Sequence, residues 1–457
     1  MLIMNKIKHT DVAIIGGGLT GLSLGFYLRQ RRLSFMVIEK EDHPGGVIKT
    51  FRESGFVFEG GPNTGVIGHL EVSALFDDLY PLCELEIANP KARKRLIWKA
   101  GRWEPIPSGI VQAVTTPLFS LKDKIRILGE PFRRRGSDPM ETVAQLVIRR
   151  MGKSFLDYAV DPFISGIYAG DPESLVTKYA LPKLYRLEQD YGSFIGGAWK
   201  KRSREKGPRP SREVFSVKGG LDNLINALVA VAGNQSVVSG ASACRVIPTE
   251  GGYAIHYTKN GQSQVLHAKQ VVSTVGGGLI RQLMPFLPAD ELQRIDTLTY
   301  APVVQVVLGF KRWPGKPLNA FGGLVPSREH RKILGILFPS AFLSGRAPEG
   351  GALLSVFVGG MRNPDMLALS DSAILDVVKT EVQQMMKLPA WDPDLVKLFR
   401  YPAAIPQYDA ESMDRLKAIV RLQMKYPGLY LVGNIQEGIG MADRIAQAKR
   451  IADLLNG

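Results

Sequence analysis

The stretch that most constrains this 457-residue chain is the segment of residues 11–21, Asp-Val-Ala-Ile-Ile-Gly-Gly-Gly-Leu-Thr-Gly. Its apolar run, residues 12–15, predicts a buried strand, and the leucines after Gly21 predict a helix. Between them, Gly16, Gly18 and Gly21 have the spacing G-x-G-x-x-G. In a strand–turn–helix, these glycines permit a tight turn, close approach of backbone N–H groups to a pyrophosphate, and close helix–strand packing. The segment therefore predicts a dinucleotide-binding site.

Two further segments indicate which dinucleotide is bound. A second predicted strand, residues 34–39, ends in Glu39, at about the distance where a carboxylate holds a ribose hydroxyl. Near the C-terminus, residues 429–434 predict a buried strand that runs into a glycine turn, and residues 437–441 lead into a final helix. Closure by so distant a segment suits a long, permanently bound cofactor. FAD is therefore favoured over NAD.

Composition limits the class of protein. With 45% hydrophobic and 22% charged residues, the chain is globular and long enough for two or three domains. Its two cysteines, Cys83 and Cys244, and its six scattered histidines have no paired spacing, so neither a disulfide framework nor a metal site is expected. No Ser/His/Asp or paired-carboxylate constellation is evident, and no catalytic residue is identified.

The formal net charge of +15 predicts an anionic partner. The first residues are too few before the dinucleotide strand for a signal peptide, and no apolar run has the roughly 18 residues of a membrane span. We therefore expect a cytoplasmic protein. Charge alone would also suit nucleic acid, but no recognition motif supports nucleic-acid binding.

Residues 104–210 differ in kind from the rest of the chain. They are rich in helix formers, with Arg and Lys next to large apolar residues, as in residues 110–114, 122–128, 143–151 and 199–202. Such helices suit the surface of an anionic bilayer, but a helical domain with a solvated basic face is an equally good interpretation. Both interpretations stay open from the sequence.

The pattern as a whole predicts an α/β fold, with a Rossmann-type FAD-binding domain, a mixed-sheet substrate domain and an inserted, mainly helical domain. The expected FAD-binding parts are residues 1–69, 211–278 and 405–457, the substrate parts are residues 70–103 and 279–404, and the helical, possibly membrane-associating part is residues 104–210.

At this point the motifs support a resemblance. The glycine motif, Glu39, Gly45-Gly46 and the C-terminal Gly433-Asn434 resemble the monoamine-oxidase-like flavoproteins. Within them, residues 161–172 (Asp-Pro-Phe-Ile-Ser-Gly-Ile-Tyr-Ala-Gly-Asp-Pro), 215–220, 321–326 and 334–339 resemble the protoporphyrinogen/coproporphyrinogen oxidase family. These signatures extend over nearly the whole chain.

The resemblance implies FAD-dependent oxidation of protoporphyrinogen to protoporphyrin in haem biosynthesis. Six electrons would leave in three two-electron steps, and oxygen would be reduced to hydrogen peroxide. Coproporphyrinogen, with four carboxylates where protoporphyrinogen has two, is the alternative substrate, because the segment around Arg95 is strongly basic. Expected partners are the porphyrinogen, oxygen, an anionic membrane surface and, in a homodimer, a second copy of the chain.

Two other classes of function remain open. An amine- or carotenoid-oxidising relative would need an aromatic cage, for which Tyr401, Tyr408 and Tyr430 are the candidates. A non-catalytic module would use FAD structurally and bind a tetrapyrrole or a membrane.

The resemblance also implies site residues. The implied cofactor contacts are Gly16, Gly17, Gly18, Leu19, Thr20, Gly21, Glu39, Lys40, Val47, Gly61, Pro62, Asn63, Thr64, Val246, Asn434, Ile439, Gly440 and Met441. The implied substrate contacts are Arg95, facing a propionate, Gly170, and the apolar Phe321, Leu324, Leu337 and Phe357 around the macrocycle. Ordinary core packing is the alternative for the apolar four. Val47 and Asn63 depart from the residue types usual in the family.

Overall fold

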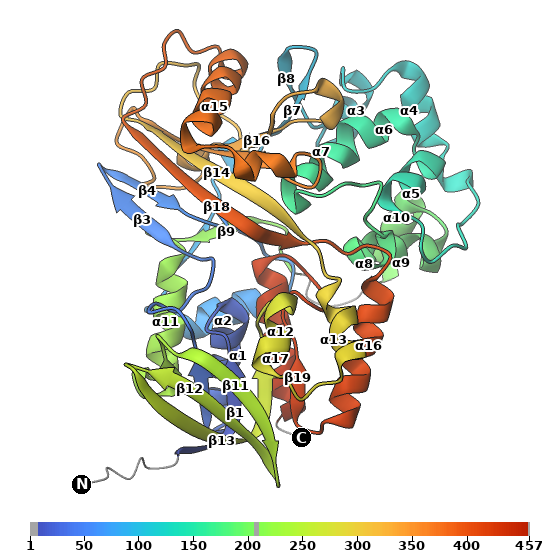
Figure 1. The fold of residues 1–457 in the computed structure, drawn as a ribbon. Helices are drawn as coiled ribbons and strands as arrows, with labels where there is room; N and C mark the ends of the chain where they lie inside the picture. Colours follow the sequence, from blue (N-terminus) through green and yellow to red (C-terminus); the bar gives the residue numbers. More distant parts are fainter. Residues whose placement is uncertain (1–7, 205–209, 456–457) are drawn as a thin grey trace.

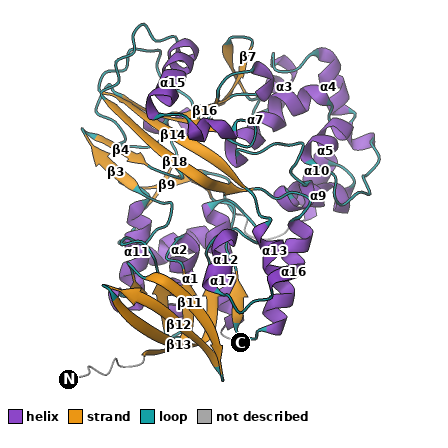
Figure 2. Cartoon of the chain, viewed as in Figure 1, coloured by secondary structure: helices purple, strands orange, loops and turns teal. Residues whose placement is uncertain are grey.

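The structure is a computed structural model that describes residues 8–204 and 210–455. Figure 1 shows two units, one above the other, with both ends of the chain in the lower unit. The upper unit contains a second sheet, and a group of helices lies beside that sheet. Figure 2 shows the same division by secondary structure, with strands and helices in both units and the helical group to the right of the upper sheet.

The lower unit is built on a seven-stranded sheet in the order β10-β2-β1-β13-β12-β11, in which β19 also pairs with β13. The strands β10, β2, β1, β13 and β19 are parallel, and β11 and β12 are antiparallel additions. The bounds are β1 (Lys8–Ile15), β2 (Phe35–Ile38), β10 (Val237–Val238), β11 (Ser242–Thr249), β12 (Gly252–Lys259), β13 (Gln262–Ser273) and β19 (Leu429–Leu431).

Helices cover both faces of this sheet, which explains why β1 is apolar on both sides. Val12 and Ile14 pack with one set of helices, α1 (Leu19–Gln30), α2 (Leu70–Leu79), α11 (Asp222–Ala232) and α17 (Met441–Leu455). Ala13 and Ile15 pack with the other set, α12 (Gly277–Leu283), α13 (Ala289–Asp296) and α16 (Ser412–Lys425).

The upper unit has a second seven-stranded sheet in the order β18-β14-β17-β16-β15-β7-β8. One face is covered by α15 (Asp371–Met386), whose Ile374 and Val378 pack with Val304 and Val306 of the sheet. The opposite face, here called the inner face, contacts Phe56, Phe58 and the loop that follows them. The bounds are β7 (Arg95–Lys99), β8 (Arg102–Pro105), β14 (Tyr300–Phe310), β15 (Gly322–Leu324), β16 (Ile333–Leu337), β17 (Ala352–Gly359) and β18 (Leu395–Pro406).

The helical group consists of short helices between β8 and β9. A buried ion-pair network joins them: the Arg150 guanidinium, fully buried, donates to Glu130 at 2.6 Å and to Glu188 at 2.7 Å. The bounds are α3 (Ile110–Thr115), α4 (Leu121–Leu128), η2 (Glu130–Phe132), α5 (Val143–Arg150), α6 (Lys153–Phe155), the π-helix η3 (Leu156–Val160), α7 (Asp161–Phe163), the π-helix η4 (Ile164–Tyr168), α8 (Thr177–Ala180), α9 (Pro182–Tyr191) and α10 (Phe194–Arg204).

Smaller elements connect the units. A hairpin pairs β3 with β4, and a three-stranded sheet has the order β5-β9-β6. The bounds are β3 (Thr50–Glu53), β4 (Phe56–Glu59), β5 (Gly65–Val66), β6 (Leu85–Ile87), β9 (Val214–Val217), α14 (Pro339–Phe342), η1 (Pro90–Ala92), η5 (Asn234–Ser236), η6 (Ser327–Glu329) and η7 (Pro364–Ala368).

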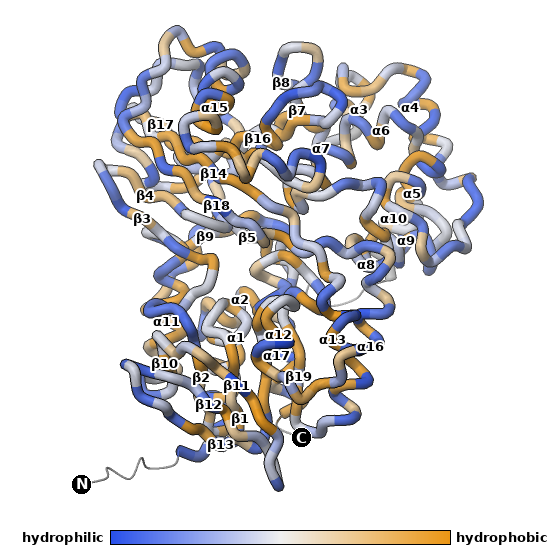
Figure 3. The backbone as a smooth tube through the Cα atoms, viewed as in Figure 1, coloured by the Kyte–Doolittle hydropathy of each residue, from blue (hydrophilic) through white to orange (hydrophobic). Residues whose placement is uncertain are grey.

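Hydropathy follows this architecture. Figure 3 shows apolar segments along the strands of both sheets, while blue segments lie at loops and at outer turns of helices. Within residues 8–204 and 210–455, no helix is long and apolar enough to cross a membrane. The same residues contain no cluster of side chains suited to hold a metal ion.

The predicted α/β architecture with an inserted helical part is confirmed. The predicted domain boundaries stay expectations. Helix α2 bears on the boundary between residues 69 and 70, because it lies in the segment predicted for the substrate part. Its Val72, Leu75 and Leu79, however, pack in the core of the lower unit. Residues 205–209 of the predicted helical part lie outside the described residues. Strand β18 lies in a segment for which the sequence predicts no strand, because its polar Lys397 and Arg400 and internal Pro402 are typical of an edge strand.

Candidate functional site

The carboxyl ends of the five parallel strands meet at one edge of the lower sheet. In register across this edge lie Val238, Ile38, Ile15, Ser273 and Leu431. The residues that follow them are the glycine motif, Glu39, the glycines after Thr274 and the turn at Gly433. Ligands of open α/β sheets bind at this edge, so the topology brings together motifs from opposite ends of the chain.

The glycine motif forms a cradle at the start of α1. Gly16 has φ +105°, and a Cβ on Gly21 would lie 2.0 Å from the carbonyl oxygen of Gly16. A Cβ on Gly18, in contrast, would meet no atom of the described residues within 4 Å. Gly18 therefore leaves open the space at the N-terminus of α1, which is where a helix can bind a phosphate.

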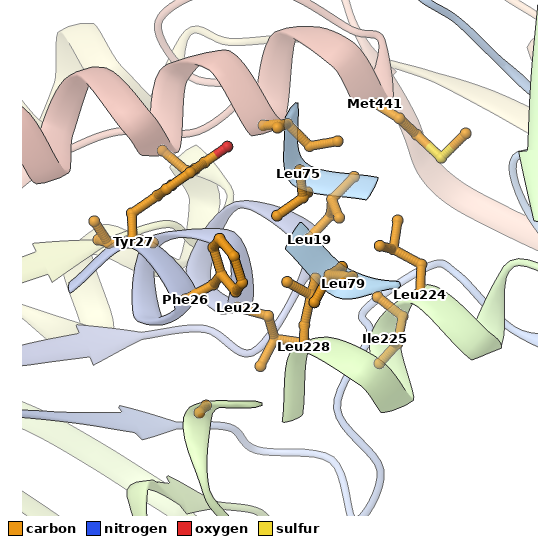
Figure 4. Packing of buried hydrophobic residues seen from close by; sticks show 14 of the residues in the cluster. Leu19, Leu22, Phe26, Tyr27, Leu75, Leu79, Leu224, Ile225, Leu228 and Met441 are labelled. Carbon is orange, nitrogen blue, oxygen red and sulfur yellow. The ribbon is translucent and has the colours of Figure 1, made fainter. Parts of the chain in front are cut away.

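Helix α1 is held in place by the core beneath it. Figure 4 shows Leu22 and Phe26 of α1 packed with Leu224 and Leu228 of α11, in a cluster that also includes Met441. The N-terminus of α1 is therefore fixed relative to the start of α17, since both helices share this core.

Glu39 lies where the sequence predicts a ribose ligand, but its carboxylate also organises the backbone. It is 6% exposed and accepts the Gly17 N–H at 2.6 Å and the Glu41 N–H at 2.9 Å. Each carboxylate oxygen accepts one bond and retains a lone pair, so Glu39 can still accept from a ribose hydroxyl.

The C-terminal turn is held by two tyrosines. The Tyr408 hydroxyl donates to the carbonyl oxygens of Asn434, at 2.9 Å, and Gly438, at 3.2 Å. Burial raises the pKa of Tyr408, so its hydroxyl remains a donor. The Tyr300 hydroxyl lies 3.4 Å from the Asn434 side-chain oxygen. These bonds fix Asn434 and the turn before Ile439, Gly440 and Met441.

A second pair of side chains supports the same turn. The Asp443 carboxylate accepts the Gly440 N–H at 3.1 Å and lies 3.1 Å from the His69 ring. His69, which the sequence gives no reason to select, thus links α2 to the first turn of α17.

Residues 59–64, here called the cofactor loop, lie against the inner face of the upper sheet. The Gln305 side chain accepts the Gly61 N–H at 3.0 Å, and Ser355 donates to the Asn63 side-chain oxygen at 3.0 Å. Asn63 is therefore buried by protein contacts, while Gly61, Pro62 and Thr64 are partly exposed.

Three predicted cofactor residues lie differently from the rest. Lys40 is exposed and pairs with Glu41 at 3.3 Å, and Val47 is 57% exposed. The side chain of Val246 is completely buried in the core cluster of the lower sheet and so is not available to a ligand.

Four of the six predicted substrate residues share the inner face. Strand register places Gln305, Phe357, Gly335, Leu324 and Ile97 in one row across the sheet. A neighbouring row contains Val307, Ser355, Leu337, Gly322 and Arg95. Because neighbouring strands lie about 4.8 Å apart, Arg95 is about 14 Å from Ser355.

The inner face is therefore apolar near the cofactor loop and cationic at its far edge. Leu324, Leu337 and Phe357 are each only partly buried. Leu324 also touches the helical group, because a Cβ on Gly166 of η4 would lie 2.3 Å from its Cδ2. The same π-helical segment thus forms a second wall, and π-helices are frequent at functional sites.

Phe321 and Gly170 lie apart from this group. The Phe321 ring packs on Phe342, with ring centroids 4.3 Å apart, and the Arg95 guanidinium lies 5.7 Å from the Phe321 ring centroid. Phe321 therefore contacts Arg95, the residue predicted to bind a substrate carboxylate. It belongs to a different cluster from the predicted apolar residues of β15 and β17. Gly170 lines a separate cavity of about 410 Å³ between η4 and the loops that follow β15 and β17.

The three tyrosines considered for an aromatic cage occupy different places. Tyr401 on β18 donates to the Gly60 carbonyl oxygen, Tyr408 to Asn434, and Tyr430 lies on β19 of the lower sheet. Gln305, which sequence reasoning missed, and Tyr401, which it considered only for an aromatic cage, reach the site from another sheet. The signal for Gln305 is a single amide within the apolar run of residues 303–308.

Comparison with known proteins identifies the family of this chain. The model of the family described as flavin containing amine oxidoreductase matches residues 19–456. Protoporphyrinogen oxidase 2 of Arabidopsis thaliana is 28% identical, over 99% of this chain and 95% of its own length. Coproporphyrinogen III oxidase of Bacillus subtilis is 27% identical, over 97% of this chain and 96% of its own length.

Solved structures show the same fold. A crystal structure of an Exiguobacterium protein superposes with a TM-score of 0.80 and 23% identity over 99% of both chains. Putrescine oxidase superposes with a TM-score of 0.72 and 17% identity. The open cradle at Gly18 and the joined edge of the lower sheet fit the flavin cofactor of this family, which is FAD. The chain belongs to the family of flavin-containing amine oxidoreductases.

Proposed function

We propose that this chain oxidises a porphyrinogen to the corresponding porphyrin, with protoporphyrinogen favoured as the substrate. The observation that carries the proposal is the inner face, where Leu324, Leu337 and Phe357 lie between the cofactor loop and Arg95. A wide apolar face with a guanidinium at its rim suits a flat macrocycle that bears propionates. The near full-length relatives named for the two porphyrinogen oxidations support the same substrate class.

The residues of this chain would act mainly by placement. Bound FAD supplies a two-electron acceptor, and oxygen then takes the electrons as hydrogen peroxide, so three rounds remove six electrons. The inner face would bind the macrocycle and exclude water, and Arg95 would fix its orientation through a carboxylate. An electron-rich porphyrinogen needs no nucleophile from the protein, which agrees with the absence of a predicted catalytic side chain.

Coproporphyrinogen is the second candidate, and one observation favours it. Lys91, Arg93 and Lys94 are exposed beside Arg95, and among the described residues none of the three forms an ion pair. A substrate with four carboxylates would use more of these cations than one with two.

The test is anaerobic mixing of the FAD-loaded protein with each porphyrinogen while the visible flavin band is followed. Bleaching by either compound supports the proposal, and the faster of the two identifies the preferred substrate. If neither compound bleaches the flavin, while dithionite does, the porphyrinogen proposal is wrong.

We also propose that the protein is cytoplasmic and associates peripherally with an anionic membrane. The helical group supports this, because Leu121, Ile125 and Leu128 of α4 are 75%, 63% and 73% exposed and lie among lysines and arginines.

A further inference from the structure

Gln305 is an unusual residue for its position. It lies in the middle of β14, between valines, and is 1% exposed. Its amide nitrogen donates to the carbonyl oxygen of Glu59 at 2.8 Å, and its amide oxygen accepts from the Gly61 N–H at 3.0 Å. A buried amide destabilises a strand unless both ends are paired. Here both ends are paired, and both partners are backbone groups of the cofactor loop.

Two adjacent strands contribute contacts of the same kind. Ser355 on β17 donates to the side-chain oxygen of Asn63 at 3.0 Å, and Tyr401 on β18 donates to the carbonyl oxygen of Gly60. Burial raises the pKa of Tyr401 to about 12, so its hydroxyl stays protonated and can donate. The three strands β18, β14 and β17 are neighbours in the sheet, so together they hold successive residues of one loop.

The loop has little room to move away from these contacts. A Cβ on Gly61, which has φ +156°, would lie 2.1 Å from the Val47 carbonyl oxygen. A Cβ on Gly60 would lie 2.6 Å from the Phe51 ring and 3.0 Å from the Phe399 ring. The loop is therefore closely confined between the lower unit and the upper sheet.

The same side chains are neighbours of the predicted substrate residues. Gln305 lies directly opposite Phe357 in the β14–β17 ladder, and Ser355 lies opposite Leu337 in the β16–β17 ladder. In each of these two rows of the inner face, a residue that holds the loop is therefore the direct neighbour of a residue expected to contact the substrate.

We propose that Gln305, Ser355 and Tyr401 are positioning residues that hold the cofactor loop in register with the inner face, so that the same three strands place both FAD and substrate. The cofactor part of this inference needs only the FAD site, whereas its kinetic part rests on the proposed function.

The experiment compares Gln305→Leu, Ser355→Ala and Tyr401→Phe with the wild-type chain. The last two remove a single hydroxyl group and should fold, and leucine suits an apolar strand. A control is Gln384→Leu, because Gln384 lies on α15, on the opposite face of the sheet, and its exposed side chain accepts a hydrogen bond from Arg331. Each apoprotein is titrated with FAD, and the absorption spectrum of the bound flavin is recorded.

We expect each hydroxyl deletion to weaken FAD binding about two- to tenfold and Gln305→Leu to weaken it about tenfold or more, because Gln305→Leu leaves two backbone groups unpaired. The flavin absorption bands should shift, and kcat should fall more than KM rises. Gln384→Leu should match the wild type. If all three variants bind FAD within twofold of the wild type with unchanged spectra and lose only thermal stability, the proposal is wrong.

The experiments test the proposed function and the positioning role independently. If no porphyrinogen is oxidised by the wild type, the proposed function is wrong, but the FAD titration still tests the positioning role. If porphyrinogen is oxidised and the three variants behave like the wild type in both FAD binding and kcat, only the positioning role is wrong.

Discussion

At the residue scale, Arg95 is the exposed cation of the proposed substrate site. It is an arginine without a carboxylate partner among the described residues, stacked near Phe321 at the end of the inner face. Its environment therefore leaves the planar fork free for a substrate carboxylate.

We predict that Arg95→Ala raises KM for porphyrinogen about tenfold and leaves FAD content unchanged, since one exposed charge-assisted contact contributes about 1.4 kcal/mol. Steady-state kinetics and the flavin-to-protein ratio check this. Arg312→Ala, another exposed arginine in a loop of the upper unit, is the control. Unchanged kinetics of Arg95→Ala would remove the propionate role.

Asp11 gives a pH prediction at the same scale. Hydrogen bonds from Lys269 and Ser34 lower the pKa of Asp11 from 3.8 to about 2. A lowered folded-state pKa contributes stability that is present above the unfolded value and is lost as pH falls towards the folded value. Since the Asp11 side chain is still 31% exposed, solvent screens its ion pair with Lys269 and the effect should be small.

We therefore expect Asp11→Asn to lower the melting temperature slightly at pH 7, and the difference from wild type to shrink between about pH 4 and pH 2. Thermal unfolding of both proteins across this range measures it. A difference that stays constant with pH would show that the Asp11 charge has no role in stability.

At the scale of elements, α4 is a helix whose large apolar side chains are exposed. It begins with a capping box between Ser120 and Asp123, yet none of its residues is buried. A helix in a protein normally gains most of its stability by packing its apolar side against the rest of the molecule. This one presents its leucines outward together with Lys122 and Arg126, which supports the membrane interpretation.

We predict that Leu128→Asp lowers cosedimentation with vesicles rich in anionic lipid by at least about tenfold, because burial of a leucine contributes about 1.5–3 kcal/mol. Binding of the wild type should weaken with salt. Met424→Asp, at a site 77% exposed on α16 compared with 73% for Leu128, is the matched control. Equal binding of all three proteins would contradict the proposal.

At the scale of the whole molecule, the cofactor edge is assembled from strands that begin at Lys8 and end at Leu431. FAD would therefore bridge segments that are connected only through the fold. A ligand that binds the native state alone stabilises it, by about 2.7 kcal/mol when its free concentration is 100 times Kd.

We predict that removing FAD lowers the melting temperature and that added FAD restores it in a concentration-dependent way, while NAD does not. Differential scanning fluorimetry of apoprotein with each dinucleotide provides the measurement. Stabilisation by NAD to the same extent would contradict the choice of FAD.

The sequence by itself determined the local chemistry. Glycine spacing, the apolar run before it and the acidic end of β2 identify a dinucleotide site, because turn geometry and strand burial are set by residues close in the chain. The helices rich in basic residues and most of the apolar strands were likewise predictable from periodicity.

Only the tertiary structure decided which distant residues meet. Gln305, Ser355 and Tyr401 reach the cofactor loop, and Tyr408 reaches Asn434, through strand order and register that no local pattern specifies. The structure likewise separates Phe321 from Leu324 and Phe357. Contacts between sheets depend on packing across the whole molecule. Local sequence patterns therefore identify the motifs but do not specify which motifs contact one another.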